Sequence, residues 1–98
     1  MKEEVRLRPE AEQDLGEAAG WYEQQQPGLG QQFLDEVTVS LSRISETPLA
    51  YPVVHRATRR ALVKRFPFGI FYLVEGGEIV VVAILHGSRN PRTWKQRS

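Results

Sequence analysis

Two adjacent glycines divide the most apolar part of this 98-residue chain into two runs. Residues 68–75 are rich in aromatic and β-branched side chains, residues 78–86 are almost entirely Val, Ile and Leu, and Gly76 and Gly77 lie between them. Both central residues of a type I′ turn need a positive φ, which glycine adopts without steric cost. The spacing therefore predicts a tight β-hairpin, and the fold must contain an antiparallel sheet.

The register of this hairpin decides which side chains share a face of the sheet. Counting from the turn, Tyr72 is expected opposite Val81 and Ile70 opposite Ala83, and residues opposite each other lie on the same face. One face then carries Phe68, Ile70, Tyr72, Val74, Ile79, Val81, Ala83 and Leu85, and the other carries Phe71, Leu73, Val80, Val82 and Ile84. Both predicted faces are apolar.

The first half of the chain has the apolar spacing of two helices. The first helix is expected to start near Pro9, and its apolar side chains form one stripe made of Ala11, Leu15, Ala18 and Tyr22. A second stripe runs through residues 29–46 and stops before Pro48, because the residue before a proline is disfavoured in helical geometry. The Pro27-Gly28 break between the stripes predicts an antiparallel helical hairpin.

Together these elements define an α+β fold. Residues 3–8 alternate charged and apolar side chains as a half-buried strand does, and residues 60–65 alternate weakly ahead of the hairpin. The expected order is an N-terminal strand, an antiparallel helical hairpin and a three-stranded antiparallel meander, within one domain spanning residues 1–98. Two helices cover only one face of such a sheet. The second apolar face is expected to be covered by the C-terminal tail through Trp94, by a second copy of the chain or by a partner protein.

The composition excludes several classes of protein. Without cysteine the chain has no disulfide, thiolate metal site or cysteine nucleophile, and no phosphate-binding or dinucleotide-binding loop is present, so we expect no cofactor and no metal. The longest apolar run, residues 79–85, is too short to span a bilayer, and the N-terminus lacks the apolar stretch of a signal peptide. We therefore expect a cytoplasmic protein without a membrane partner.

The formal charge of +1 hides a strong asymmetry between the two halves of the chain. Residues 1–50 hold four Lys and Arg against ten Asp and Glu, a net charge of −6, whereas residues 51–98 hold nine against two, a net charge of +7. Such segregation indicates that the second half meets an anionic partner, either nucleic acid or an acidic protein segment. The alternative is that the two halves neutralise each other across the fold.

The predicted register also gathers basic side chains at one end of the sheet. The turn at residues 66–68 is expected beside the end of the last strand, which would bring together Lys64, Arg65, His86, Arg89 and Arg92. Arg and His in such an arrangement can hold a phosphate and assist proton transfer, although a solvated rim of basic side chains would have the same pattern. Elsewhere, the acidic residues of the first helix, Asp14 among them, are expected on a solvated face, and Trp21-Tyr22 in core and helix packing.

Several segments occur in an order that is typical of one protein family. LRPEAEQDLGEAAGWY at residues 7–22 is followed by residues 41–48, by Arg59-Arg60, by FGIFY at residues 68–72 and by VVVAILHGSRNP at residues 80–91. In this order they resemble the first helix, second helix, sheet and tail of the RelE/ParE superfamily, the toxins of type II toxin–antitoxin systems, which are also known as plasmid stabilisation proteins. The resemblance covers nearly the whole chain and implies the α+β fold derived above.

The resemblance implies a bacterial toxin that arrests growth and is neutralised by a cognate antitoxin encoded beside it, as a homodimer or as a heterotetramer with that antitoxin. An acidic antitoxin segment that folds on binding would suit both the basic second half and the apolar sheet face. The residues expected to contact the antitoxin or the target are Arg60, Phe71, Leu73, Val80, Val82, Ile84, Arg92 and Trp94.

Members of this superfamily differ in their targets. ParE-like members inhibit DNA gyrase, whereas RelE-like members are ribosome-dependent mRNA endonucleases that use basic residues and a C-terminal Tyr, His or Arg. Gly69 stands where the resemblance places the catalytic Arg of RelE-like members, and the tail has no Tyr, so inhibition of gyrase is favoured. If the chain instead cleaves mRNA on the ribosome, the expected catalytic residues are Lys64, Arg65, His86 and Arg89. A non-toxic module that binds the antitoxin is the third hypothesis.

Overall fold

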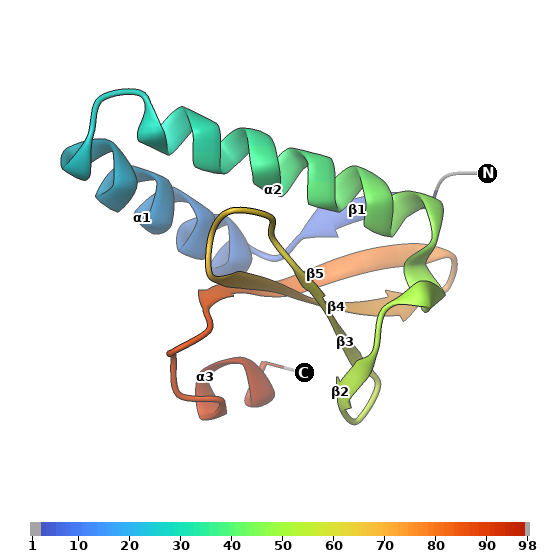
Figure 1. Cartoon of the computed structure of the whole chain (residues 1–98). Coiled ribbons are helices and arrows are strands. Elements are labelled where there is room, and N and C mark those ends of the chain that lie inside the picture. The colour runs from blue at the N-terminus through green and yellow to red at the C-terminus, as the bar shows by residue number, and fades with distance from the viewer. Residues whose placement is uncertain (1–2, 98) are drawn as a thin grey trace.

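The computed structural model describes residues 3–97 and arranges their main elements in two layers (Figure 1). In chain order the elements are β1 (Glu4–Leu7), α1 (Pro9–Gln25), α2 (Leu29–Glu46), the short 3-10 helix η1 (Pro48–Ala50), β2 (Val53–His55), β3 (Thr58–Leu62), β4 (Phe68–Glu75), β5 (Glu78–His86) and α3 (Arg92–Lys95). Helices α1 and α2 lie side by side on one face of the sheet, and α3 lies on the other side. The predicted α+β class is confirmed. In the part of the chain that the structure describes, no helix is long and apolar enough to cross a membrane.

The sheet has five strands in the order β1-β5-β4-β3-β2. Strands β2 to β5 form an antiparallel meander, and β1 pairs with β5 in parallel, so α1 and α2 form the crossover between these two strands. The meander has one strand more than predicted, because Val53–His55 pairs with β3. A run of three residues after Pro52 is too short to show the two-residue period of a strand.

The β4–β5 hairpin closes through the predicted turn. Gly76 and Gly77 have φ angles of 57° and 78°, values that other residues adopt only with strain. Glu75 lies opposite Glu78, which confirms the predicted register next to the turn.

A β-bulge in β5 changes the register in the second half of the hairpin. Val82 is the extra residue, so Ile70 lies opposite Ile84, and the predicted pairing of Ile70 with Ala83 is wrong. As a result Val82 and Ala83 both pack on the side of α3, while Ile84 joins the core under α1 and α2. Because both faces of the hairpin are apolar, the sequence pattern carries no signal of this shift.

An aromatic cluster holds the sheet against both helices. The ring of Phe33 in α2, which is fully buried, lies 5.2 Å from that of Phe66 and 4.9 Å from that of Phe68. The ring of Tyr22 in α1 lies 4.9 Å from that of Phe66. Aromatic pairs of this kind stabilise a fold beyond the burial of their area. The cluster therefore fixes the turn at residues 66–68 beneath the helical layer.

The C-terminal tail covers the second face of the sheet. Trp94 of α3 is 8% exposed, and its ring stacks on that of Phe71 with a centroid distance of 4.4 Å and an interplanar angle of 19°. Leu73, Val82 and Leu85 belong to the same buried cluster. Of the three coverings considered for this face, the structure shows the chain's own tail.

Tyr72 is the largest fully buried side chain and links β4 to η1. Its hydroxyl donates a hydrogen bond of 2.5 Å to the carbonyl oxygen of Pro48. Replacing Tyr72 by phenylalanine (Tyr72→Phe) should lower the free energy of unfolding at neutral pH by about 1 kcal/mol, because the carbonyl loses its donor. Urea denaturation of both proteins measures this difference.

The Tyr72→Phe variant also tests how the stability of the fold depends on pH. Burial raises the pKa of Tyr72 from 10.0 to about 12, and Arg59 opposes this effect only in part. The neutral phenol therefore favours the folded state: its contribution is complete below pH 10 and is lost as the pH rises towards about 12. Between these pH values the wild type should lose stability more steeply than the Tyr72→Phe variant, and equal slopes would contradict this assignment.

Candidate functional site

The candidate site lies at the end of the sheet where β4 begins and β5 ends. Phe68 lies opposite His86 there, and the carbonyl oxygen of Pro67 accepts a hydrogen bond of 2.8 Å from the N–H of Gly87. This bond ties the segment after β5 to the turn beneath the aromatic cluster. His86 and Arg89 are therefore held at the sheet end where the sequence places them.

Two hollows flank this end of the sheet. The first, here called the α1 pocket, has a volume of about 500 Å³ and lies between α1 and β5. The second, here called the tail pocket, has a volume of about 330 Å³ and lies between the sheet and Trp94. Both are lined by Phe68, Leu85, His86 and Arg89. These four residues therefore form a wall that the two pockets share.

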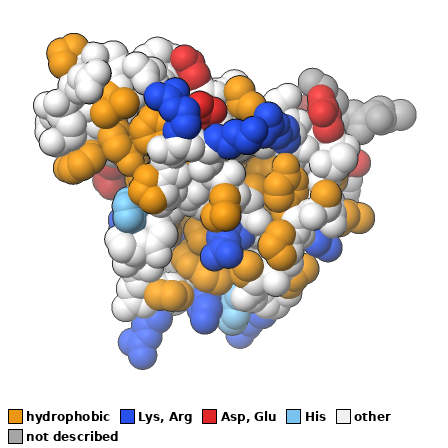
Figure 2. All heavy atoms as spheres, in the orientation of Figure 1, with side chains coloured by type: hydrophobic (Ala, Val, Ile, Leu, Met, Phe, Trp, Pro, Cys, Tyr) orange, Lys and Arg blue, Asp and Glu red, His pale blue; other side chains and the backbone are white. Residues whose placement is uncertain are grey.

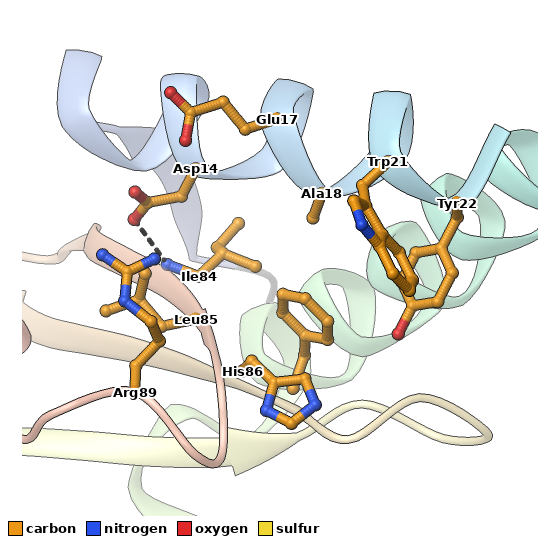
Figure 3. Close-up of a pocket in the computed structure, with 10 residues that line it drawn as sticks. Asp14, Glu17, Ala18, Trp21, Tyr22, Ile84, Leu85, His86 and Arg89 are labelled. Atoms are coloured by element: carbon orange, nitrogen blue, oxygen red, sulfur yellow. Dashed lines mark hydrogen bonds between the residues drawn. The ribbon is translucent and has the colours of Figure 1, made fainter. Parts of the chain in front are cut away.

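Helix α1 forms one wall of the α1 pocket, as Figure 3 shows. Its Trp21 is 57% exposed and meets Tyr22 edge to face, with a centroid distance of 5.2 Å. Tyr22 packs in the aromatic cluster as predicted, but the prediction that Trp21 also packs in the core is wrong. An exposed indole beside an apolar hollow is typical of surfaces that contact other proteins.

Asp14 is buried beside this pocket, so the prediction of a solvated position for Asp14 is also wrong. Its carboxylate accepts hydrogen bonds of 3.1 Å from the N–H of Ile84, which is the dashed line in Figure 3, and of 2.6 Å from Nη1 of Arg97. The same Arg97 nitrogen donates to the carbonyl oxygen of Val82 at 3.2 Å. Strand β1 pairs with β5 only as far as Val81, so these two side chains satisfy backbone groups of β5 beyond the end of β1.

Of the two residues in this ion pair, only the buried position of Asp14 could be predicted from the sequence. Asp14 follows Ala11 by three residues and precedes Ala18 by four, so the helical period places it on the apolar stripe and not on the solvated face. Its partner Arg97 lies 83 residues away, in a tail without a periodic pattern. Only the tertiary structure brings the two together.

The lining of the tail pocket holds basic side chains and, among the described residues, no acidic one. Arg60 of β3 lines it together with Arg89 and His86, and none of the described residues that line it is Asp or Glu. Within residues 3–97, neither Arg60 nor Arg89 takes part in an ion pair. Lys and Arg side chains also gather along the lower edge of Figure 2, towards α3 and β2. This end of the molecule is therefore suited to an anionic group.

Arg60 reaches the tail pocket across Gly69. A Cβ atom on Gly69 would lie 3.2 Å from Cδ of Arg60 and 3.2 Å from a ring carbon of Phe71. Nε of Arg60 is buried and has no hydrogen-bond partner among the described residues. The aliphatic stem of Arg60 thus lies over Gly69, in space that a side chain at residue 69 would otherwise enter.

The other predicted basic residues lie apart from the pockets. Arg65 donates hydrogen bonds to Gln32 at 2.9 Å and to Glu36 at 3.5 Å, both on α2. Lys64 and Arg92 are exposed and line neither pocket. Of the basic residues predicted to cluster, the pockets therefore bring together His86 and Arg89, with Arg60 added from β3.

The turn after β5 orients the imidazole of His86. Its Nδ1 accepts a hydrogen bond of 3.0 Å from the N–H of Ser88 and lies 2.8 Å from the hydroxyl oxygen of the same residue. A neutral imidazole bound in this way carries its proton on Nε2. In residues 3–97 no group of three or more His, Asp and Glu side chains is placed to hold a metal ion.

The apolar residues predicted to contact a partner are buried within the chain. Val80, Val82 and Ile84 are fully buried, and Phe71 and Leu73 are at most 9% exposed. Apolar side chains that remain available to another protein include Trp21 at the α1 pocket and Leu62 at the tail pocket, which is 68% exposed.

Comparison with known proteins assigns the family. A family model described as the ParE toxin of type II toxin–antitoxin systems, parDE, matches residues 5–91. The structure is similar to a chain of the chromosomal ParDE system from P. aeruginosa, with a TM-score of 0.77, 17% identity, and coverage of 87% of this chain and 96% of that chain. It is also similar to a chain of the RelBE2 toxin–antitoxin complex from Mycobacterium tuberculosis, with a TM-score of 0.61, 18% identity, and coverage of 88% and 99%.

A search of curated proteins gives no match. At 17% and 18% identity the two solved structures establish the fold. The family model covers most of the chain, from β1 to the beginning of the tail. The chain therefore belongs to the ParE toxin family of type II toxin–antitoxin systems.

Proposed function

We propose that this chain is a ParE-like toxin that arrests bacterial growth by inhibiting DNA gyrase, and that a cognate antitoxin neutralises it. The observation that carries the proposal is the match to the ParE toxin family over residues 5–91. The antitoxin partner is supported by the two similar structures, both of which belong to toxin–antitoxin systems.

Three features of the sheet end support inhibition by protein contact over RNA cleavage. Gly69 provides no side chain where the resemblance to RelE-like members places a catalytic Arg. Lys64 and Arg65 lie outside both pockets, and the tail has no Tyr. Cleavage of RNA needs an acid and a base placed around the scissile phosphate, whereas a protein inhibitor needs exposed anchors such as Trp21.

Pulse labelling after brief induction in bacteria that lack the antitoxin tests this function. Thymidine incorporation should fall before amino-acid incorporation, because inhibition of gyrase stops replication first. Co-expression of the proposed antitoxin, the protein encoded beside this gene, should restore the incorporation of both thymidine and amino acids. An earlier fall in amino-acid incorporation would instead indicate a ribosome-dependent mRNA endonuclease, and no fall in either would indicate a non-toxic module that binds the antitoxin.

The exposed indole of α1 provides a matched pair of variants for the same test with purified gyrase. Trp21→Ala should weaken inhibition of DNA supercoiling by about tenfold, because aromatic anchors dominate protein interfaces. Leu49→Ala, which truncates an apolar side chain 66% exposed on η1, should leave inhibition within about twofold of wild type. Equal effects of the two substitutions would remove Trp21 from the gyrase contact.

A further inference from the structure

The tail pocket combines two arginines that form no ion pair within residues 3–97 with a largely apolar lining. Arg60 and Arg89 line it, as do Leu62, Phe71 and Trp94. We propose that this pocket receives an acidic side chain of the antitoxin, whose carboxylate is held by Arg60 and Arg89 while an adjacent apolar residue of the antitoxin packs against the exposed Leu62. This inference rests on the proposed antitoxin partner and identifies the chemistry of its contact.

The placement of Arg60 indicates that a ligand completes the pocket. Nε of Arg60 is buried without a partner among the described residues, and its aliphatic stem lies where Gly69 leaves room for it. The guanidinium of Arg60 also takes part in no ion pair within residues 3–97, so the fold leaves its charge without a counterion. A carboxylate on the outer guanidinium nitrogens would balance the charge that the fold leaves unpaired.

The walls of the pocket favour a peptide over a nucleic acid. Leu62 is 68% exposed at the pocket, and the face of Trp94 that stacks on Phe71 is already occupied. Phosphate groups gain nothing from apolar walls, and an indole already stacked offers one face fewer to a base. An antitoxin segment with an acidic and an apolar side chain next to each other satisfies both parts of the pocket.

Isothermal titration with the purified protein encoded beside this gene tests the assignment. Arg60→Gln and Arg89→Gln should each weaken antitoxin binding by about tenfold or more. The affinity of the double variant should fall by less than the product of the two single losses, because both arginines hold one carboxylate. Arg43→Gln on α2 makes the same change of charge on an exposed residue that lines neither pocket, and it should stay within about twofold of wild type.

Gly69→Ala perturbs the site without changing its charge. The added methyl group would lie 3.2 Å from Cδ of Arg60 and should displace that side chain, so antitoxin binding should weaken while thermal unfolding shows a folded protein. In a Trp21→Phe background Trp94 is the only tryptophan, and its fluorescence should respond to the antitoxin. This response places the antitoxin at the tail pocket directly.

Two results would overturn the assignment. One is that Arg60→Gln and Arg89→Gln bind the antitoxin as tightly as Arg43→Gln does. The other is that Trp94 fluorescence responds to a single-stranded oligodeoxynucleotide and not to the antitoxin, which would make the pocket a nucleic-acid site. Neither result depends on the pulse-labelling experiment. If pulse labelling showed that the toxin acts on translation, gyrase inhibition would be refuted, but the proposed contact with the antitoxin would still stand.

Discussion

Replacing Asp14 by alanine should lower the free energy of unfolding by about 3 kcal/mol. The carboxylate is 8% exposed, pairs with Arg97 at 2.6 Å and accepts the N–H of Ile84 at 3.1 Å. Removing it leaves a buried amide without an acceptor and a guanidinium without its counterion. Release of Arg97 should also loosen α3, so that Trp94 becomes more exposed to solvent.

Urea denaturation measures the first effect and quenching of Trp94 fluorescence by iodide in a Trp21→Phe background measures the second. Glu17→Ala removes an exposed carboxylate on the turn of α1 that follows Asp14, and it should change stability by less than about 0.5 kcal/mol. A double-mutant cycle with Arg97→Ala should give a coupling of about 1 kcal/mol or more. If the losses of unfolding free energy in Asp14→Ala and Arg97→Ala simply add in the double variant, Asp14 stabilises the fold through the N–H of Ile84 alone.

Gly30→Ala should destabilise the fold by about 2 kcal/mol, because α1 and α2 approach closely at this residue. A Cβ atom there would lie 2.6 Å from the carbonyl oxygen of Ala19 and 3.0 Å from Cβ of Glu23. The first of these neighbours belongs to the backbone of α1, so it moves only if the helices separate. The N–H of Gly30 also donates to the Glu23 carboxylate at 3.0 Å, a bond that separation would break.

Gly16→Ala is the control for this substitution. Gly16 lies in the interior of α1, and nothing lies within 4 Å of where its Cβ would be. Alanine is the better helix former, so this variant should be more stable than wild type by about 0.5–1 kcal/mol. Thermal unfolding should therefore show a lower unfolding temperature for Gly30→Ala and a higher one for Gly16→Ala. A higher unfolding temperature for Gly30→Ala would contradict the close approach of the two helices.

Local patterns in the sequence were sufficient to predict most of the elements. The two-glycine turn gives the end of β4 at Glu75 and the start of β5 at Glu78, and the stripe over residues 29–46 gives α2 its limits, because each signal depends on neighbours a few residues apart. The prolines that follow α1 and α2, Pro27 and Pro48, mark the ends of these two helices for the same reason. Strand β2 escaped prediction because three residues are too few to establish a period.

The candidate site was predictable only in part. The placement of His86 and Arg89 beside the turn at residues 66–68 follows from the direction of the last two strands, which the hairpin determines. Arg60 in the tail pocket depends on how β3 pairs with β4 and on the absence of a side chain at Gly69. Arg65 turns away because two residues of α2 offer it partners.

By itself the sequence determined the order of the two long helices and the four strands other than β2, the α+β class, the hairpin turn and the charged second half, since all of these follow from short-range spacing and composition. Only the tertiary structure decided the bulge at Val82, the covering of the second face by Trp94 and the pairing of Asp14 with Arg97. A bulge between two equally apolar faces leaves the hydrophobic pattern unchanged. A contact between residues 83 positions apart forms only after the sheet and α1 have come together.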